Sequence, residues 1–349
     1  MVGKDGFLVR IFCATYNHES YITDAIQGFV MQETSFPVVY TIVDDASTDK
    51  TAEVLRRFVN EHFDVGSNSG GYDKDTDYGH VTFARHKTNK NCYFAVIYLK
   101  ENHFSQKKSK APYLTEWMDT KYVALCEGDD YWTDPYKLQK QVDYMEKHEK
   151  CVCFAHNSFL YDTALNCLSL FVKSRVNHCD FTLPEFLKKA WFTPTQSLLY
   201  RQTALSSDKL VRGYMHGDYS LLIRLLLYPD SYLHYDNQVM SVYRAGGYAS
   251  THYNETKLCD DFIALFEDAK AESNHVCDDV FDQLIEIQEK EKLYLAEYDR
   301  DLKKSRSTFV KIMHFICRKI ASVSNLYFDC LRVEKRVVKK CNPPLEKLK

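Results

Sequence analysis

Three carboxylates follow an apolar run in the middle of the chain. Residues 122–126 read Tyr-Val-Ala-Leu-Cys, and Glu127, Asp129 and Asp130 come directly after them. Such a run is typical of a buried parallel strand, and ligands gather at the carboxyl ends of these strands. Neighbouring carboxylates repel one another and are costly to remove from water, so a partly buried cluster needs a cation. The pattern predicts a divalent-cation site, and a solvated acidic turn is the alternative.

Two earlier apolar runs also end in polar residues. Residues 7–14 are predicted to form a strand that ends in the turn Thr-Tyr-Asn-His-Glu, and residues 38–43 a strand that ends in Asp44 and Asp45. Amphipathic helices are expected after both, over residues 20–30, with Ser20 as the cap, and from Asp49 onwards. This β-α-β-α order predicts a mostly parallel, doubly wound sheet, which places the polar strand ends on one edge.

The rest of the first 250 residues fits the same α/β class. A polar loop is expected at 66–79, and the basic turn 85–91 is expected either on the acidic rim or as a solvated loop. Trp132 and His216 are expected to pack in the core or at its rim, with a ligand contact as the alternative. Further strands are predicted at 81–84, 151–155, 197–200, 232–235 and 239–243, with the last two as a strand pair, and helices at 92–101, 135–149 and 219–227.

Composition restricts the class of protein. The 349 residues include 45% hydrophobic and 14% aromatic residues, which is typical of a folded protein, and the net charge of -3 argues against a nucleic-acid partner. The 12 cysteines are scattered and lack metal-ligand spacing, so we expect reduced thiols and no zinc site. No signal peptide or membrane-spanning run is evident, which predicts a cytoplasmic protein.

The final 99 residues, 251–349, differ in charge from the rest and are expected to form a helical extension. Residues 254–304 hold 15 Asp or Glu against 7 Lys or Arg, a net charge of -8, whereas residues 305–349 hold 3 against 11, a net charge of +8. The basic part has apolar residues at helical spacing. It therefore predicts an amphipathic helix, with peripheral contact to an anionic membrane through 305–340; docking on the acidic helix or on a partner is the alternative.

The motifs that are missing narrow the chemistry. The chain has no Gly-x-Gly-x-x-Gly, no Walker-type loop and no Gly-x-Ser-x-Gly, which argues against a dinucleotide oxidoreductase, a P-loop enzyme and an α/β-hydrolase. An acidic strand edge that holds a metal is a common way to bind a diphosphate and make it a better leaving group. Transfer from a nucleotide sugar, or nucleotidyl transfer, fits this edge best.

From about Val9 to Gly247 the sequence resembles the inverting family 2 glycosyltransferases, which have the GT-A fold. Four motifs occur in the family's order. These are Ala14-Thr15-Tyr16-Asn17, then Val43-Asp44-Asp45-Ala46-Ser47-Thr48-Asp49, then Glu127-Gly128-Asp129-Asp130, then Gly217-Asp218. The resemblance implies a GT-A, Rossmann-like, mostly parallel sheet over residues 1–250 that moves a sugar from a nucleotide sugar, expected to be a UDP-sugar, to a saccharide or lipid-linked acceptor.

The same resemblance assigns roles to individual residues. Thr15 and Tyr16 are expected to cradle and stack on the nucleobase, and Asp45 to accept a hydrogen bond from the imide N–H of uracil. Asp130 is expected to bind Mn²⁺ or Mg²⁺ together with Asp129, which also meets the ribose, while Glu127 with Asp129 is the alternative acidic pair. The full set expected to bind the donor is Ala14, Thr15, Tyr16, Asn17, Glu19, Asp44, Asp45, Asp129 and Arg244.

Asp218 is expected to be the general base that deprotonates the acceptor hydroxyl; a helix-capping Asp is the alternative. One departure concerns the donor phosphates, because Asn89-Lys90-Asn91 lacks the glycine of the family's Asn-x-Gly turn. Arg85, Lys87 and Arg244 are the expected substitutes. The alternatives to a glycosyltransferase are a nucleotidyltransferase and an inactive protein that binds nucleotide sugars or glycans.

Overall fold

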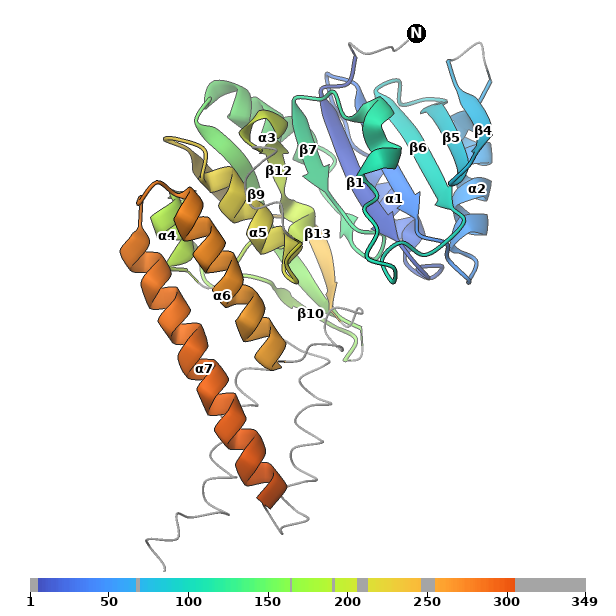
Figure 1. Cartoon of the computed structure of the whole chain (residues 1–349). Coiled ribbons are helices and arrows are strands. Elements are labelled where there is room, and N and C mark those ends of the chain that lie inside the picture. Colours follow the sequence, from blue (N-terminus) through green and yellow to red (C-terminus); the bar gives the residue numbers. More distant parts are fainter. Residues whose placement is uncertain are drawn as a thin grey trace, which may run out of the picture. The chain divides into compact units, whose positions relative to one another are not determined.

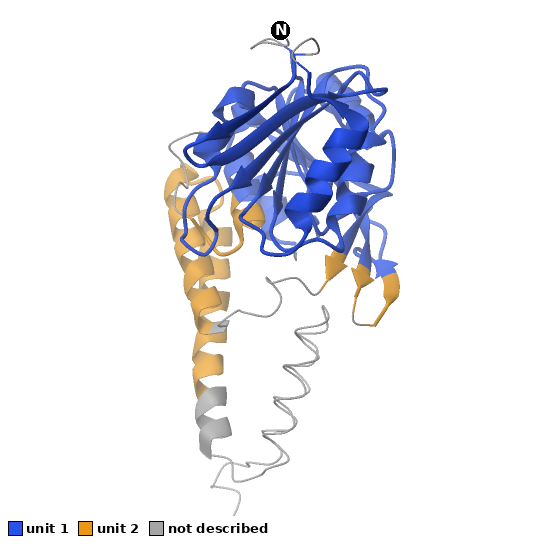
Figure 2. Cartoon of the chain, turned by 90° about the vertical axis from the view of Figure 1, so that its right-hand side faces the viewer, with its two compact units in different colours: residues 1–160, 169–207, 221–243 blue, residues 161–168, 208–220, 244–349 orange. Residues whose placement is uncertain are grey.

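The computed structural model describes residues 6–66, 70–163, 165–189, 192–205, 213–245 and 255–304. The chain divides into two compact units (Figure 2). The first comprises residues 1–160, 169–207 and 221–243, and the second comprises 161–168, 208–220 and 244–349. The expected interfacial segment 305–340 lies outside the described residues, and the domain boundary at residue 250 stays a prediction.

Strands and helices alternate from β1 to α2, and four strands, β3 to β6, then follow one another (Figure 1). The strands are β1 (Val9–Thr15), β2 (Val38–Asp44), β3 (Phe63–Asp64), β4 (Tyr72–Thr76), β5 (Gly79–His86), β6 (Cys92–Leu99), β7 (Tyr122–Leu125), β8 (Tyr131–Trp132), β9 (Cys151–Asp162), β10 (Cys167–Leu170), β11 (Asp180–Phe181), β12 (Leu199–Arg201) and β13 (Tyr232–Ala245). The helices are α1 (Ile22–Val30), α2 (Thr51–His62), α3 (Lys137–Lys147), α4 (Leu183–Leu187), α5 (Gly217–Leu226), α6 (Glu255–Glu272) and α7 (Asp278–Lys304), with 3-10 turns η2 (Ala111–Trp117), η3 (Thr195–Ser197) and η4 (Gln202–Ala204).

The described strands form one mixed sheet in the order β11-β13-β9-β12-β7-β1-β2-β6-β5-β3. Its centre is parallel, because β1 pairs in parallel with β7 and β2, and β2 pairs in parallel with β6. β12 is antiparallel to β7, and β5 is antiparallel to β6. The mostly parallel α/β sheet expected from the sequence is therefore confirmed, and the carboxyl ends of β1, β2, β6 and β7 meet at one edge.

Both faces of the central strands are buried. Along β1, Val9, Ile11 and Cys13 enter a core that also contains residues of α1, α2 and α3, whereas Phe12 packs against the core on the opposite face. That second core includes Leu114 and Trp117 of η2. Burying such side chains stabilises the fold by roughly 1.5–3 kcal/mol each. A strand covered on both sides is apolar throughout, which is why β1, β2 and β7 could be recognised.

Several elements differ from the sequence-based expectation. The helix expected at 92–101 is wrong: residues 92–99 form β6, in which all eight residues are buried. Residues 72–76, expected to lie in a loop, form β4, which pairs with β5. The strand pair expected at 232–243 is the single strand β13. Ser20 does not cap α1, whose first turn has no side-chain cap.

Helices α6 and α7 of the second unit pack on each other. Phe266 of α6 meets Phe281 of α7 with ring centroids 6.4 Å apart, and Lys270 of α6 pairs with Asp282 of α7 at 2.5 Å. The helical extension is therefore confirmed as far as residue 304. No helix among the described residues has the length and apolar character needed to cross a bilayer.

Candidate functional site

The loops after β1 and β2 are joined by hydrogen bonds. Asn17 has a φ of 55°, in the left-handed region that Asn tolerates better than most residues. In this conformation its backbone N–H donates to Ser47 Oγ at 2.9 Å, and its Oδ1 accepts from the Thr48 N–H at 2.8 Å. The residues of the first two motifs thus lie together at the carboxyl edge, as expected.

Glu19 and Asp49 extend this connection. The Glu19 N–H donates to Asp49 Oδ2 at 3.0 Å, and Glu19 Oε2 accepts from the Lys50 N–H at 2.9 Å. Burial alone would raise the pKa of Asp49, but hydrogen bonds from Thr51 and Glu19 outweigh it and lower that pKa. In this structure Asn17 and Glu19 hold two loops together, and their contact with a donor stays a prediction.

Thr15 and Tyr16 face different surroundings. Thr15 is buried, and its Oγ1 has no hydrogen-bond partner among the described residues. Tyr16 is 42% exposed, so its ring can receive a flat ligand group. Ala14, one residue earlier, accepts a hydrogen bond from the Gly128 N–H at 2.9 Å. This bond places the acidic turn, residues 127–130 after β7, directly on the end of β1.

Gly128 is required for that close approach. A Cβ atom at this position would lie 2.6 Å from Thr15 Oγ1, closer than real Cβ contacts, and 3.0 Å from His18 Nδ1, which is tighter than most such contacts. Asp130 is buried, and its N–H donates to the Glu127 carbonyl at 3.1 Å, which closes the turn. The glycine between Glu127 and Asp129 therefore lets the acidic turn seat on β1.

The acidic turn produces a negative field in its surroundings. Burial raises the pKa of the Cys13 thiol, and the charges on Glu127, Asp129 and Asp130 raise it further. Among the described residues, no group of three or more His, Cys, Asp or Glu is arranged as a complete metal site. A site of one or two carboxylates suits Mg²⁺ or Mn²⁺, which take their remaining ligands from phosphate oxygens and water. The residues present fit such an ion.

Asp44 and Asp45 have different partners. Asp44 Oδ1 accepts from the N–H and Oγ of Ser47, and burial is the main cause that raises the pKa of Asp44. The Asp45 carboxylate is buried and faces the segment after β6. It accepts from the N–H groups of His103 and Phe104 and pairs with Lys110. The sequence-based reading missed this segment, although it has the signal used elsewhere: polar residues directly after a continuous apolar run.

The basic turn 85–91 does not lie at the acidic edge. The Val38 N–H, at the amino end of β2, donates to the Asn91 carbonyl at 2.8 Å, and Asn91 Nδ2 bonds the Thr34 carbonyl. Arg85 donates to the Lys90 carbonyl within the turn itself. The turn thus sits beside the strand starts, because β5 runs antiparallel to β6. Arg85 and Lys87 are therefore wrong as substitutes for a phosphate contact at the carboxyl edge.

Asp218 and Arg244 belong to the second unit. Asp218 is the second residue of α5, inside the first turn, where a carboxylate interacts favourably with the helix dipole. It is partly buried, and its Oδ1 accepts from the Tyr219 N–H at 2.8 Å. His216 stacks on Phe262 of α6 with centroids 4.9 Å apart, and burial lowers its pKa. Arg244 is the penultimate residue of β13.

Trp132 is a core residue, as expected. It is 1% exposed, its Nε1 donates to the Gln196 carbonyl at 2.8 Å, and Phe29 packs against its ring. Lys137 Nζ lies 4.2 Å from the centroid of the same ring. Trp132, two residues after Asp130, therefore anchors the acidic turn to the core.

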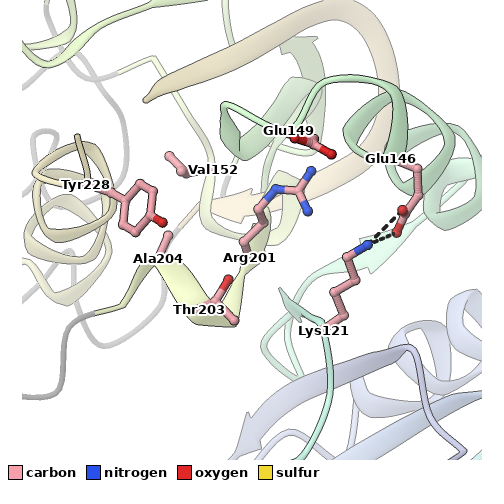
Figure 3. A pocket seen from close by; sticks show the side chains of 8 residues that line it. All are labelled: Lys121, Glu146, Glu149, Val152, Arg201, Thr203, Ala204 and Tyr228. Carbon is pink, nitrogen blue, oxygen red and sulfur yellow. Dashed lines mark hydrogen bonds and ion pairs between the residues drawn. The ribbon is translucent and has the colours of Figure 1, made fainter. Parts of the chain in front are cut away.

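A pocket of about 280 Å³ lies elsewhere in the first unit (Figure 3). Lys121, just before β7, and Arg201, at the end of β12, line it. Lys121 points to Glu146 and pairs with it at 2.7 Å (Figure 3), while Arg201 donates to Tyr122 Oη at 3.0 Å and to the Cys151 carbonyl at 2.9 Å. Lys121 is thus in an ion pair and Arg201 is hydrogen-bonded, and the pocket opens beside the start of β7, not beside the acidic turn.

Residues 11–93, which contain β1, α1, β2 and α2, match the model of the family described as Glycosyl transferase family 2. The resemblance to the family 2 glycosyltransferases is thereby confirmed over this segment. Over 220 residues the chain is 30% identical to an uncharacterized protein of Mycobacterium tuberculosis. The aligned residues make up 62% of this chain and 53% of that protein.

A second relative comes from Bacillus subtilis, the "Putative teichuronic acid biosynthesis glycosyltransferase TuaG", with 27% identity over 154 residues, 44% of this chain and 48% of that protein. The chain thus spans about half the length of these curated relatives. The solved structure of residues 1–349 of S. aureus TarS in complex with UDP-GlcNAc matches with a TM-score of 0.52 at 13% identity, over 95% of this chain and 90% of that one. This likeness confirms the GT-A fold.

Proposed function

We propose that this protein is a metal-dependent, inverting glycosyltransferase that moves a sugar from a UDP-sugar to a saccharide or lipid-linked acceptor. The observation that carries the proposal is the meeting of three loops at one sheet edge. The loop after β1 is bonded to the loop after β2 through Asn17, and to the acidic turn after β7 through Ala14. UDP-GlcNAc, bound to TarS, is a donor of the expected kind.

The loops after β1 and β7 have separate tasks in donor binding. Tyr16, which is exposed, stacks on the nucleobase. Asp130, with Asp129 or Glu127, holds a divalent cation, which supplies charge neutralisation for the diphosphate leaving group. Gly128 sets the distance between these carboxylates and Thr15, so the diphosphate and the base are held on one edge.

Asp218 is proposed to be the general base. This assignment rests on the Gly217-Asp218 motif and on the partly buried position of Asp218 in the first turn of α5. It would take the proton from the acceptor hydroxyl as the hydroxyl oxygen attacks the anomeric carbon, and the bond to the diphosphate would break on the opposite side. Inversion of the anomeric configuration follows from this single displacement.

Binding of nucleoside diphosphates tests the proposal. Calorimetry with UDP, GDP, CDP and dTDP, each with and without Mn²⁺, is expected to show metal-dependent binding with UDP preferred. Asp130→Asn is the matched variant, because it keeps the side-chain size and removes the charge. Binding that is equal with and without metal would contradict the metal role, and no binding of any of the four would contradict the proposed function.

A further inference from the structure

The segment after β6, residues 102–110, lies at the carboxyl edge of the sheet, where the donor is proposed to bind. β6 is the third strand beside β1 and β2 in the parallel set, in register from Val38 with Cys92 to Asp44 with Tyr98. The chain therefore leaves β6 next to Asp44 and Asp45. This topology brings a fourth loop to the edge where the loops after β1, β2 and β7 meet, whereas the turn 85–91 lies elsewhere.

Asp45 fixes the backbone of this segment. Its Oδ1 accepts from the His103 N–H at 2.8 Å, and its Oδ2 accepts from the Phe104 N–H at 3.0 Å and lies 3.0 Å from Lys110 Nζ. Asn102 Nδ2 also donates to the Asp45 carbonyl at 3.0 Å. Hydrogen bonds to a buried carboxylate are about twice as strong as neutral ones. Three donors thus occupy a carboxylate that is only 2% exposed.

Lys107 has an unusual backbone conformation in this segment. Its φ is 55°, in the left-handed region where glycine is unstrained and other residues pay roughly 1–2 kcal/mol. Two hydrogen bonds close the turn, from the Lys107 N–H to the Phe104 carbonyl at 3.1 Å and from the Lys108 N–H to the His103 carbonyl at 2.9 Å. A lysine therefore stands where glycine would fit best, and strain of this kind is common at binding sites.

The lysines of this segment differ in their partners. Lys108 pairs with Glu101, and Lys110 pairs with Asp45. Lys107 is exposed, and no carboxylate of the described residues is within ion-pair distance of it. Its ammonium is thus the one among these three that is available to an anion, on a backbone that Asp45 holds in place.

We propose that Lys107 binds the diphosphate of the nucleotide-sugar donor, and that Asp45 is a positioning residue that holds the loop carrying it. The inference rests on the proposed function and deepens it. A lysine is a flexible point charge that suits phosphate oxygens. The Lys107 ammonium would add to the cation at Asp130 in neutralising the diphosphate, without touching the nucleobase.

Calorimetry on the full chain with Mn²⁺ tests this, with UDP and uridine as the two probes. Lys107→Gly removes the ammonium and relieves the backbone strain. UDP is expected to bind about tenfold more weakly, equivalent to roughly 1.4 kcal/mol, while uridine binds as before and the melting temperature is unchanged or higher. Lys90→Ala, in the turn at the opposite edge, is the matched control and is expected to bind UDP like wild type.

Asp45→Asn tests the positioning role. If Asp45 acts through the loop, Asp45→Asn also lowers the affinity for UDP. The double variant, Asp45→Asn with Lys107→Gly, is then expected to bind UDP no more weakly than whichever single variant binds it less well. Losses that add, together with weaker uridine binding, would show that Asp45 touches the base and would overturn its positioning role. Unchanged UDP binding by Lys107→Gly overturns the Lys107 assignment alone, whereas a wild-type protein that binds no nucleoside diphosphate overturns the proposed function as well.

Discussion

The backbone of Gly128 lies directly against the side chain of Thr15, so that a Cβ atom on Gly128 would come within 2.6 Å of Thr15 Oγ1. This contact joins the end of β7 to the end of β1. The acidic turn and the loop expected to bind the nucleobase therefore form one structural unit, and a change at Gly128 must affect both.

Gly128→Ala is expected to lower metal-dependent UDP binding at least tenfold and to destabilise the fold by about 1–3 kcal/mol, the usual cost of overpacking. Calorimetry with UDP and Mn²⁺, and urea unfolding, measure the two effects. Gly213→Ala is the control, because a Cβ there has open space within 4 Å. Wild-type UDP affinity in Gly128→Ala would contradict the described packing.

Two substitutions at Asn17 separate its backbone conformation from its hydrogen bonds. Asn17→Gly accommodates the left-handed φ of 55° but loses the hydrogen bond that the Thr48 N–H donates to Oδ1, whereas Asn17→Ala loses that bond and strains the backbone. We expect Asn17→Ala to be less stable than Asn17→Gly by about 1 kcal/mol. Chemical denaturation of the two variants checks the order, and equal stability would show that the backbone conformation at Asn17 costs nothing.

Lys137 is expected to make stability depend on pH. It is fully buried, and desolvation is the main cause that lowers its pKa to about 7, with Nζ bonded to Gln141 Oε1 at 2.8 Å. Between pH 7 and the unfolded pKa of 10.5, the unfolded chain holds a proton that the folded chain has lost. The contribution of Lys137 to the free energy of unfolding therefore rises with pH across this window.

Lys137→Met removes that proton equilibrium. Relative to wild type, the variant is expected to be most stable near pH 6 and to lose this advantage, by up to about 4 kcal/mol in total, as pH rises towards 10. Urea unfolding of both proteins at pH 6, 7.5 and 9 measures the difference. A difference that is constant with pH would mean that Lys137 titrates near its ordinary value in the folded protein.

Asp218→Asn is expected to lower kcat by about 10²–10⁴-fold while UDP binding stays at the wild-type level. The amide keeps the bond from the Tyr219 N–H and removes only the proton acceptor. Asp279→Asn is the matched control, because Asp279 is likewise an acid in the first turn of a helix of the second unit. A wild-type kcat in Asp218→Asn would assign the base elsewhere.

The sequence carried enough information for β1, β2, β7 and the loops after them, because each has an apolar run followed by chemically distinctive residues. Residues 92–99 were harder, since a strand buried on both faces shows no alternation and cannot be separated from a buried helix by periodicity. Because residues 92–99 were read as a helix, the loop after β6 was not recognised, and the turn 85–91 was expected on the acidic rim or as a solvated loop in place of 102–110. The roles of Asn17 and Asp45 in joining loops depend on contacts across 30 to 60 residues, which no local pattern encodes.

The central claim is metal-dependent sugar transfer from a UDP-sugar at the acidic edge. The most direct measurement is release of UDP from a panel of UDP-sugars by wild type and Asp130→Asn, with Mn²⁺ and with a chelator, in the presence of pooled saccharide and lipid-linked acceptors. We predict release by wild type with Mn²⁺ that chelation abolishes and that Asp130→Asn reduces at least 100-fold. UDP release that neither chelation nor Asp130→Asn reduces, or no release from any UDP-sugar, would contradict the account.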